Sequence, residues 1–417
     1  MMLEFLFQNT DVALYVALLL ASVSLLVIYV FRLHNFKLIT QYASWQIEAQ
    51  EIEEATHDAI TIDANGNYPR ISIVVPVNEQ SVGIQSLLNN LFRQNYKGYY
   101  EVVLADESHS PELHDLFEEQ TKRNVNVRYT FVPNTSRYIE LRKLAITLGI
   151  KASRGEWVIV VNPETSPISD NWLQCYAQNL GEDVNFAEAY YNYDDDGSLV
   201  ARRAIFERID KFSTRLNAWK NGIVVACNTA NWAVRKKWFV EQGGFADSLN
   251  ITFGEEAIFA NHKVNAENYV MLCSPETRLV EELATKHELS VNRMHSVEVM
   301  HHLSRSAKRK MFVSGAVTFT SYLFVLCLLF YTSMRIFCDV EAYQYSVSYV
   351  YTDILALTLW ILGLSLPISI VRTALRTLNE RKYGFYIYVY EMLRPFHALS
   401  AKLKYRIHKE EFVRKYI

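Results

Sequence analysis

Residues 71–77 read ISIVVPV, a continuous apolar run that is rich in β-branched side chains. Such a run is typical of a strand buried on both faces of a sheet. Two similar runs follow, EVVLA at residues 101–105 and WVIVV at residues 157–161, and helical patterns at residues 81–96 and 142–153 separate the three. An alternation of strands and helices favours right-handed crossovers and parallel pairing. The sequence therefore predicts an α/β fold with a mainly parallel sheet.

Each of the three predicted strands ends in polar residues. The pairs are Asn78 with Glu79, Asp106 with Glu107, and Asn162 with Glu164. Ligands of such sheets bind beyond the carboxyl ends of the strands, so these side chains are candidates for a binding site. A plainer interpretation stays open, because acids after a strand often cap the next helix and Asn-Pro is an ordinary turn signal.

The composition argues against several other classes of protein. The formal net charge of -3 over 417 residues gives no support to nucleic-acid binding, which needs a concentrated basic face. The five cysteines show neither a CxxC pair nor a metal-ligand spacing, so neither a disulfide scaffold nor a zinc site is indicated. The run Asp194 to Asp196 before Gly197 predicts a hairpin turn rather than a metal site.

Three long apolar runs predict membrane helices. They cover residues 12–31, 311–334 and 354–371, and each is near the length of about 20 residues that crosses a bilayer. The first run is preceded by acidic residues and no small-residue cleavage site follows it, which favours an anchor over a signal peptide. These helices would leave a connector at residues 32–68 and a domain at residues 69–310.

Basic residues flank the predicted membrane helices on one side. Lys and Arg near a membrane helix tend to stay in the cytoplasm, so we expect residues 32–310 and the tail at 372–417 there. Residues 1–11 and 335–353 are expected outside. The tail is rich in Tyr, Lys and Arg, which suits a helix at the membrane surface. The sequence thus predicts an integral membrane protein with a cytoplasmic domain.

Five motifs in order resemble the family 2 glycosyltransferases, specifically the membrane-anchored bacterial type. The motifs are VVPVNEQ, EVVLADES, RKLAITLGIKASRGEWVIVVNPETSPISDNWL, NWAVRKKWF with GGF, and FGEEAIF. The resemblance covers about residues 71–310. It implies a nucleotide-sugar-binding domain of the GT-A type, sugar transfer with inversion at the anomeric carbon, and a location in the bacterial inner membrane.

The resemblance also implies roles for individual residues. Asn162, Pro163 and Glu164 lie where the family has its DxD motif, which is degenerate here, and Asn162 and Glu164 would hold a divalent cation, Mg²⁺ or Mn²⁺. Glu256, beside Glu255, takes the place of the last acid of the Gly-Glu-Asp motif, the general base. The residues expected at the nucleotide sugar are Pro76, Glu79, Asp106, Glu107, Lys143 and Asn231.

The chemistry of an inverting transfer agrees with these roles. One carboxylate must take the proton of the attacking acceptor hydroxyl, and positive charge must stabilise the departing diphosphate. The acids Glu255 and Glu256 could instead form an ordinary first helical turn, where the helix dipole favours negative charge. We expect an enzyme that moves a sugar from a nucleotide-sugar donor to a lipid-linked or polysaccharide acceptor at the cytoplasmic face, in contact with membrane lipids. The alternative is a catalytically weakened relative that acts as a binding or assembly subunit in a membrane glycan-synthesis complex.

Overall fold

The computed structural model describes most of the chain. The described residues are 10–56, 68–78, 83–108, 111–123, 126–133, 141–249, 251, 253–281, 285–313, 347–380 and 386–414, with single residues and pairs between 315 and 334. Glu79 and most of residues 311–346 therefore lie outside them. The chain divides into unit 1 (Met1–Leu38, Arg309–Arg376, Glu380–His397) and unit 2 (Ile39–Lys308, Thr377–Asn379, Ala398–Ile417).

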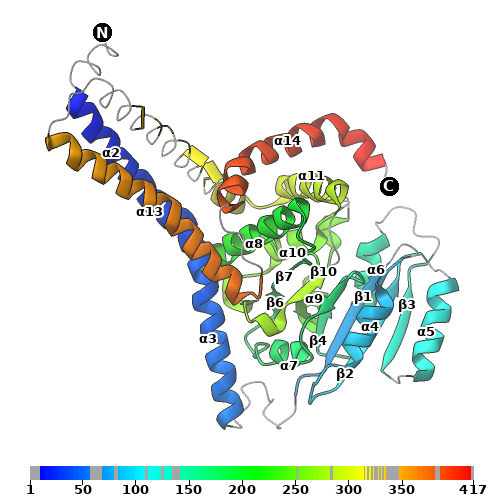
Figure 1. The fold of residues 1–417 in the computed structure, drawn as a ribbon. Helices are drawn as coiled ribbons and strands as arrows, with labels where there is room; N and C mark the ends of the chain where they lie inside the picture. Colours follow the sequence, from blue (N-terminus) through cyan, green and yellow to red (C-terminus); the bar gives the residue numbers. More distant parts are fainter. Residues whose placement is uncertain are drawn as a thin grey trace. The chain divides into compact units, whose positions relative to one another are not determined.

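Unit 2 contains a seven-stranded sheet with the order β3-β2-β1-β4-β8-β6-β9 (Figure 1). Its strands are β1 (Ile71–Val77), β2 (Tyr100–Asp106), β3 (Val127–Phe131), β4 (Trp157–Val160), β6 (Phe186–Ala189), β8 (Trp232–Arg235) and β9 (Tyr269–Leu272). Strands β1 to β4 are parallel to one another, β6 is parallel to β9, and β8 is antiparallel to both of its neighbours. The predicted α/β class with a mainly parallel sheet is confirmed.

The three strands predicted from the sequence are β1, β2 and β4, at the centre of the parallel part. Every residue of β1 and β4 is buried, which explains their unbroken apolar runs. The register pairs Ile71 with Tyr100 on one side and with Trp157 on the other. The three strands therefore end close together, and the polar residues that follow them meet at one edge of the sheet.

Pro76 lies inside β1, where a missing backbone N–H would normally cost a ladder hydrogen bond. The pairing of β1 with β4 ends at Val74 opposite Val160, and the Val74 carbonyl accepts the Val161 N–H. Alternate residues of a strand point the same way, so the nitrogen of Pro76 faces the β4 side, beyond the last pair of that ladder. The proline therefore lies where the pairing with β4 stops, since it has no N–H with which to continue this ladder.

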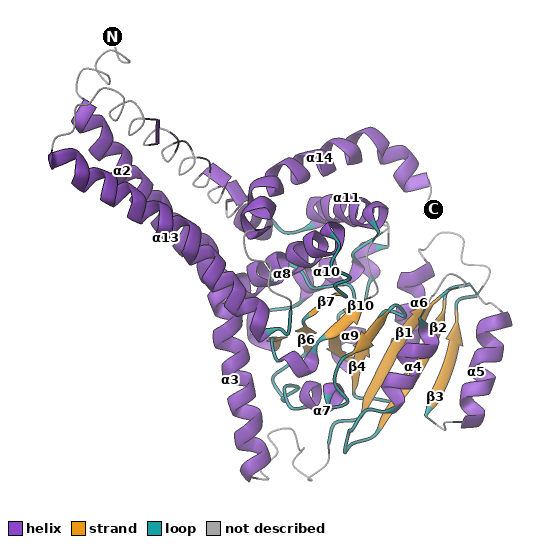
Figure 2. Cartoon of the chain, viewed as in Figure 1, coloured by secondary structure: helices purple, strands orange, loops and turns teal. Residues whose placement is uncertain are grey.

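Helices lie against the parallel strands (Figure 2). They are α4 (Ile84–Phe92), α5 (Pro111–Arg123) and α6 (Leu141–Ala152). Helix α4 buries Leu87, Leu88 and Leu91, as its sequence pattern predicts. Helix α6 packs on β1, β2 and β3, and α5 packs on β3. Both helical patterns predicted between the strands are confirmed.

The rest of unit 2 carries a second, three-stranded sheet with the order β5-β10-β7. Its strands are β5 (Thr165–Pro167), β7 (Tyr191–Tyr193) and β10 (Leu279–Glu281). The accompanying elements are α7 (Trp172–Ala177), α8 (Leu199–Lys220), α9 (Lys236–Glu241), η2 (Ala246–Ser248), α10 (Glu255–Lys263), η3 (Ala266–Asn268), η4 (Pro275–Thr277) and α11 (Lys286–His302).

The predicted hairpin at Asp194–Gly197 is wrong. The segment joins β7 to helix α8, whose N-cap is Ser198. Asp195 accepts the Gly197 N–H, and Asp196 accepts the Ser198 N–H. An Asp-Gly pair serves a helix entry as well as a hairpin, because short acidic side chains satisfy the free N–H groups of both.

The predicted connector is helical in its first half. Helix α3 (His34–Thr56) covers it up to Thr56. Within unit 2, the buried Gln46 side chain donates to the Met271 carbonyl and accepts the Cys273 N–H. This amide continues the hydrogen-bonding edge of β9 with a side chain, so α3 is fixed to the end of the sheet.

Unit 1 contains α2 (Thr10–Ile28), the π-helix η1 (Tyr29–Leu33) and α13 (Val347–Thr377), and α14 (Tyr386–Arg414) begins in it. Leu18 and Ala21 of α2 form a small core with Leu359 of α13. Within the part of the chain that the structure describes, no helix combines the length and the apolar composition that crossing a membrane requires. The membrane helices predicted from residues 12–31 and 354–371 are therefore not supported, and the one predicted from residues 311–334 lies largely outside the described residues.

Candidate active site

Polar side chains gather in unit 2 around Arg142, which lies in the first turn of α6. Its guanidinium contacts the residues that follow β4 and the first turn of α10. Acids that follow β2 and β4 are close enough to act electrostatically on one another and on Arg142. We call this group the Arg142 cluster: Arg142, Glu107, Asn162, Glu164, Glu255 and Glu256.

Arg142 connects the acids of α10 to the residue that follows β4. Its Nη1 donates to Glu255 Oε1 at 2.7 Å, and its Nη2 donates to Asn162 Oδ1 at 2.8 Å. Nη2 also lies 3.3 Å from the Thr229 carbonyl oxygen. About a quarter of the Arg142 side chain is exposed, whereas Glu255 is buried. A buried carboxylate needs such a partner, because an unpaired charge in the interior is costly.

Gly254 sets the direction of the two acids in α10. Its φ is 79°, in the left-handed region that favours glycine, and it is the N-cap of the helix. An added Cβ would lie 2.2 Å from Val299 Cγ2 of α11, so glycine also permits the close approach of the two helices. Glu255 and Glu256 follow at once and are both buried.

Glu256 is the least satisfied acid of the cluster. Its side chain is 1 % exposed, and neither carboxyl oxygen has a hydrogen-bond partner among the described residues. Arg142 Nη1 lies 4.0 Å from Glu256 Oε2. Burial, and then the charge of Glu255, raises the pKa of Glu256 to about 8. A carboxyl group with this pKa can accept a proton in its ionised form, which becomes the major form above about pH 8.

Glu107 follows β2 and faces the same group. Its pKa is raised to about 7, chiefly by burial and to a smaller extent by Glu255 and Glu164, while Arg142 opposes the shift. Asn78, which follows β1, donates its side-chain amide to Glu107 at 3.4 Å. Asn78 and Glu107 therefore meet at the ends of neighbouring strands, as the sequence predicts.

Asp106 and Lys143, two other predicted site residues, form hydrogen bonds within the chain. Asp106 accepts the Ser108 N–H at 2.8 Å and the Tyr129 hydroxyl at 2.6 Å. Lys143 donates to the carbonyls of Ser248 and Ile251, at 2.5 and 2.6 Å, and so holds the segment that leads into α10. For Asp106 and Lys143 these bonds give a structural role, and contact with a nucleotide stays a prediction.

Asn231, a third predicted site residue, is fixed between the two sheets. Its φ is 102°, and its amide nitrogen donates to the Tyr190 and Thr277 carbonyls at 2.8 and 2.9 Å. Its Oδ1 has no hydrogen-bond partner among the described residues. Asn231 is completely buried, so its predicted contact with the nucleotide sugar stays a prediction that this burial does not favour.

Sequence reasoning selected Lys143 and missed its neighbour Arg142. Lys143 lies three and seven residues before Ile146 and Ile150, and all three are buried in α6. This spacing places Lys143 on the apolar face of the helix. The spacing was therefore a usable signal that the preceding basic residue, rather than Lys143, reaches the open edge of the sheet.

Comparison with known proteins identifies the domain that contains most of this cluster. Residues 72–243 match the family described as Glycosyl transferase family 2. The chain carries a glycosyl transferase family 2 domain. Glu107, Arg142, Asn162 and Glu164 lie within the matched residues of this glycosyltransferase, and Glu255 and Glu256 follow them.

Two solved structures are similar to the chain at low identity. A mannosyltransferase, PcManGT from Pyrobaculum calidifontis in complex with GDP-Man and Mn²⁺, is 12% identical with a TM-score of 0.48, over 83% of this chain and 99% of that one. TarS 1–349 from S. aureus in complex with UDP-GlcNAc is 16% identical with a TM-score of 0.38, over 81% of this chain and 91% of that one. No curated protein matches the chain.

The contact of Asn162 with Arg142 does not suit a divalent cation at this amide oxygen. Among the described residues, no group of three or more His, Cys, Asp or Glu side chains is arranged to hold a metal ion. Asn162 Oδ1, one of the two predicted ligands, already accepts a hydrogen bond from Arg142. A cation at this oxygen would meet the positive guanidinium. The pairing of Asn162 and Glu164 as metal ligands is therefore not favoured.

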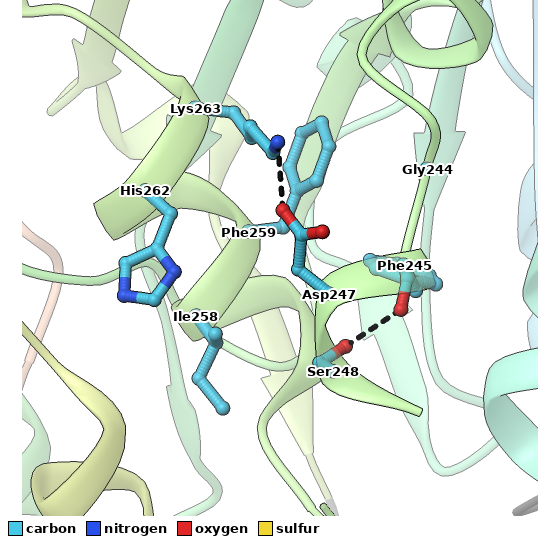
Figure 3. A pocket seen from close by; sticks show the side chains of 8 residues that line it. All are labelled: Gly244, Phe245, Asp247, Ser248, Ile258, Phe259, His262 and Lys263. Carbon is cyan, nitrogen blue, oxygen red and sulfur yellow. Dashed lines mark hydrogen bonds and ion pairs between the residues drawn. The ribbon is translucent and has the colours of Figure 1, made fainter. Parts of the chain in front are cut away.

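A small hollow in unit 2 is lined by residues between Gly244 and Lys263, and neither Glu255 nor Glu256 is among them (Figure 3). Ile258, Phe259, His262 and Lys263 line it from the later turns of α10, whereas Glu255 and Glu256 belong to the first turn. An ion pair of 2.7 Å between Lys263 and Asp247 bridges the hollow, as Figure 3 shows. We assign the hollow no part in the chemistry.

The raised pKa of Glu256 predicts how the stability of the protein changes with pH. Its pKa is near 4.5 in the unfolded chain and about 8 in the folded protein, so between these pH values only the folded state holds the proton. The free energy of unfolding then falls as pH rises from about 4.5 to 8, by an amount on the order of a few kcal/mol. We expect Glu256→Gln to melt at the wild-type temperature at pH 4.5 and several degrees higher at pH 8, because ~1 kcal/mol shifts the melting temperature by about 2–4 °C.

The measurement is a series of thermal melts of both proteins across this pH range. Glu118→Gln is the matched control, because its side chain on α5 is 55% exposed. An equal effect of the Glu256 substitution at both ends of the range would contradict the raised pKa.

Proposed function

We propose that unit 2 transfers a sugar from a nucleotide-sugar donor to an acceptor hydroxyl with inversion at the anomeric carbon. The observation that carries the proposal is Glu256, a buried carboxylate without a hydrogen-bond partner among the described residues, beside the strand ends of a family 2 domain. A buried acid with a strongly raised pKa in such a position is characteristic of a catalytic site.

The proposed reaction forms one bond to the anomeric carbon and breaks another. The acceptor oxygen attacks the anomeric carbon, and its proton passes to Glu256. A new carbon–oxygen bond forms while the bond from the anomeric carbon to the diphosphate breaks. The bonding electrons leave with the diphosphate oxygen. Glu256 then returns its proton to solvent.

The nucleotide part of the donor would lie at the ends of β1 and β2. Glu107 is half-buried there and, with a pKa of about 7, is partly protonated at neutral pH. In either form it offers oxygens to the hydroxyl groups of a ribose. Asp106 fixes the turn behind it through its bond to the Ser108 N–H. This arrangement supports a nucleoside diphosphate sugar as the donor class.

For the acceptor we propose a lipid-linked glycan or a polysaccharide, and for the protein a place at the cytoplasmic face of a membrane. The support is the apolar surface of unit 1. Leu19 and Leu26 of α2 and Ile361 of α13 are more than half exposed. Large apolar side chains gathered on a surface mark a contact with lipid or protein.

This location predicts the behaviour of the full chain during fractionation. We expect the protein in the membrane pellet after a high-salt wash, because apolar contacts with lipid are not screened by salt. Sodium carbonate and detergent extractions, followed by blotting, then distinguish surface binding from insertion. Recovery of the whole protein in the high-salt supernatant would contradict the proposed lipid contact.

The activity itself is tested on the purified full chain in detergent. A panel of nucleotide sugars is incubated with and without candidate lipid-linked acceptors, and the release of nucleoside diphosphate is measured. The configuration of the product is read by NMR, and an inverted anomeric centre is expected. No release from any donor, together with stable binding to other membrane proteins, would favour the assembly subunit over the enzyme.

A further inference from the structure

We propose that Arg142 performs the task of the divalent cation, so that this domain binds and stabilises the donor diphosphate without a metal ion. The inference rests on the proposed function and names the group that holds the diphosphate. It assigns a binding role to Arg142, a residue that the sequence motifs leave without one.

The position of Arg142 carries the first part of the argument. Its guanidinium touches Asn162, the first residue of the altered DxD motif, at 2.8 Å. It also touches Glu255 beside the proposed base. The positive charge therefore lies between the end of β4 and the first turn of α10, where a departing diphosphate needs it.

The hydrogen-bonding capacity of the guanidinium gives the second part. Arg has five N–H donors, and three of them reach oxygens of described residues: Glu255, Asn162 and Thr229. Two donors remain for a ligand, and the side chain is 26% exposed. These two donors, Nε–H and one Nη1–H, lie on different edges of the guanidinium, so each would contact a separate oxygen of the diphosphate.

The residue type at position 162 gives the third part. Glu255 already forms an ion pair with Arg142, and a carboxylate at position 162 would add a second one. The amide oxygen of Asn162 accepts the hydrogen bond without adding a negative charge. The guanidinium thus keeps its position without a further carboxylate bound to it.

The anchoring of α6 gives the fourth part. Lys143, next to Arg142 in this helix, donates to the carbonyls of Ser248 and Ile251, so Arg142 starts from a rigid position.

The test measures binding of UDP and GDP to the purified full chain by calorimetry, in EDTA and in Mn²⁺. We expect the wild type to bind one of them equally well in both conditions. Arg142→Gln should bind it about 10- to 100-fold more weakly, the range of a hydrogen bond to a charged group. Arg142→Lys should fall between, because it keeps the charge and loses the guanidinium donors.

Further variants separate binding from folding. Lys151→Gln removes an exposed positive charge from the last turn of the same helix and should bind as the wild type does. Arg142→Gln combined with Glu255→Gln leaves no unpaired Glu255 carboxylate, and a melt shows that it is folded while the loss of binding persists. Asn162→Asp combined with Glu164→Asp should weaken binding in EDTA, because the new carboxylate at position 162 would add a second ion pair to Arg142.

The binding results distinguish a failure of the role of Arg142 from a failure of the proposed function. Binding that vanishes in EDTA and returns with Mn²⁺ would overturn the role of Arg142 and leave the proposed function intact. Wild-type affinity in folded Arg142→Gln would overturn it as well. No binding of either nucleotide in any condition, and no turnover of any donor, would remove the proposed function and this inference with it.

Discussion

Glu256→Gln is expected to lower donor turnover by about 100- to 10,000-fold, the range that a general base contributes. Gln has the shape of Glu but cannot take the acceptor proton. Binding of the nucleoside diphosphate should be unchanged, since the proton transfer belongs to the chemical step. The rate of the wild type should rise with pH and level off above about 8, because the base must be ionised.

The control for this substitution is Asp247 of η2, whose partner Lys263 is the last residue of α10. Asp247→Asn breaks an ion pair to Lys263 and leaves the Arg142 cluster untouched, so its turnover should equal that of the wild type. Because Glu256→Gln is expected to be more stable at pH 8, unfolding cannot explain its lost turnover. Wild-type turnover in Glu256→Gln would exclude this residue as the base.

Gly254→Ala is expected to lower turnover by about 100-fold, because a displacement of about 1 Å in a catalytic group has an effect of that size. The new Cβ would meet Val299 Cγ2 at 2.2 Å, and the left-handed φ of 79° is itself unfavourable for alanine by about 1–2 kcal/mol. The first turn of α10, with Glu255 and Glu256, must then move. The variant should also melt at a lower temperature.

A second substitution separates the collision from the backbone strain. Gly254→Ala combined with Val299→Ala removes the colliding methyl group, so turnover should recover in part while the strain remains. Val299→Ala alone measures the cost of the missing methyl. If the single Gly254→Ala variant keeps full turnover, the position of the acids does not depend on the approach of α10 to α11.

Much of the parallel half of the fold could be predicted from local patterns. The runs at 71–77, 101–105 and 157–161 are buried on both faces, and a strand in that environment has no polar face to obscure its pattern. The hairpin predicted at Asp194–Gly197 failed because the same acidic turn serves a helix entry. Membrane helices were predicted from the length of three apolar runs; the described helices do not support the first and the third, and the second lies largely outside the described residues.

The sequence by itself determined the α/β class, the three central strands and the acids at their ends. Burial on two faces and helical periodicity both produce patterns among residues that are close in the sequence. Only the tertiary structure decided which groups the two adjacent basic residues contact. Lys143 turns toward the carbonyls of Ser248 and Ile251, and Arg142 turns toward Asn162 and Glu255. Their partners lie up to 113 residues away along the chain, and packing alone brings them together.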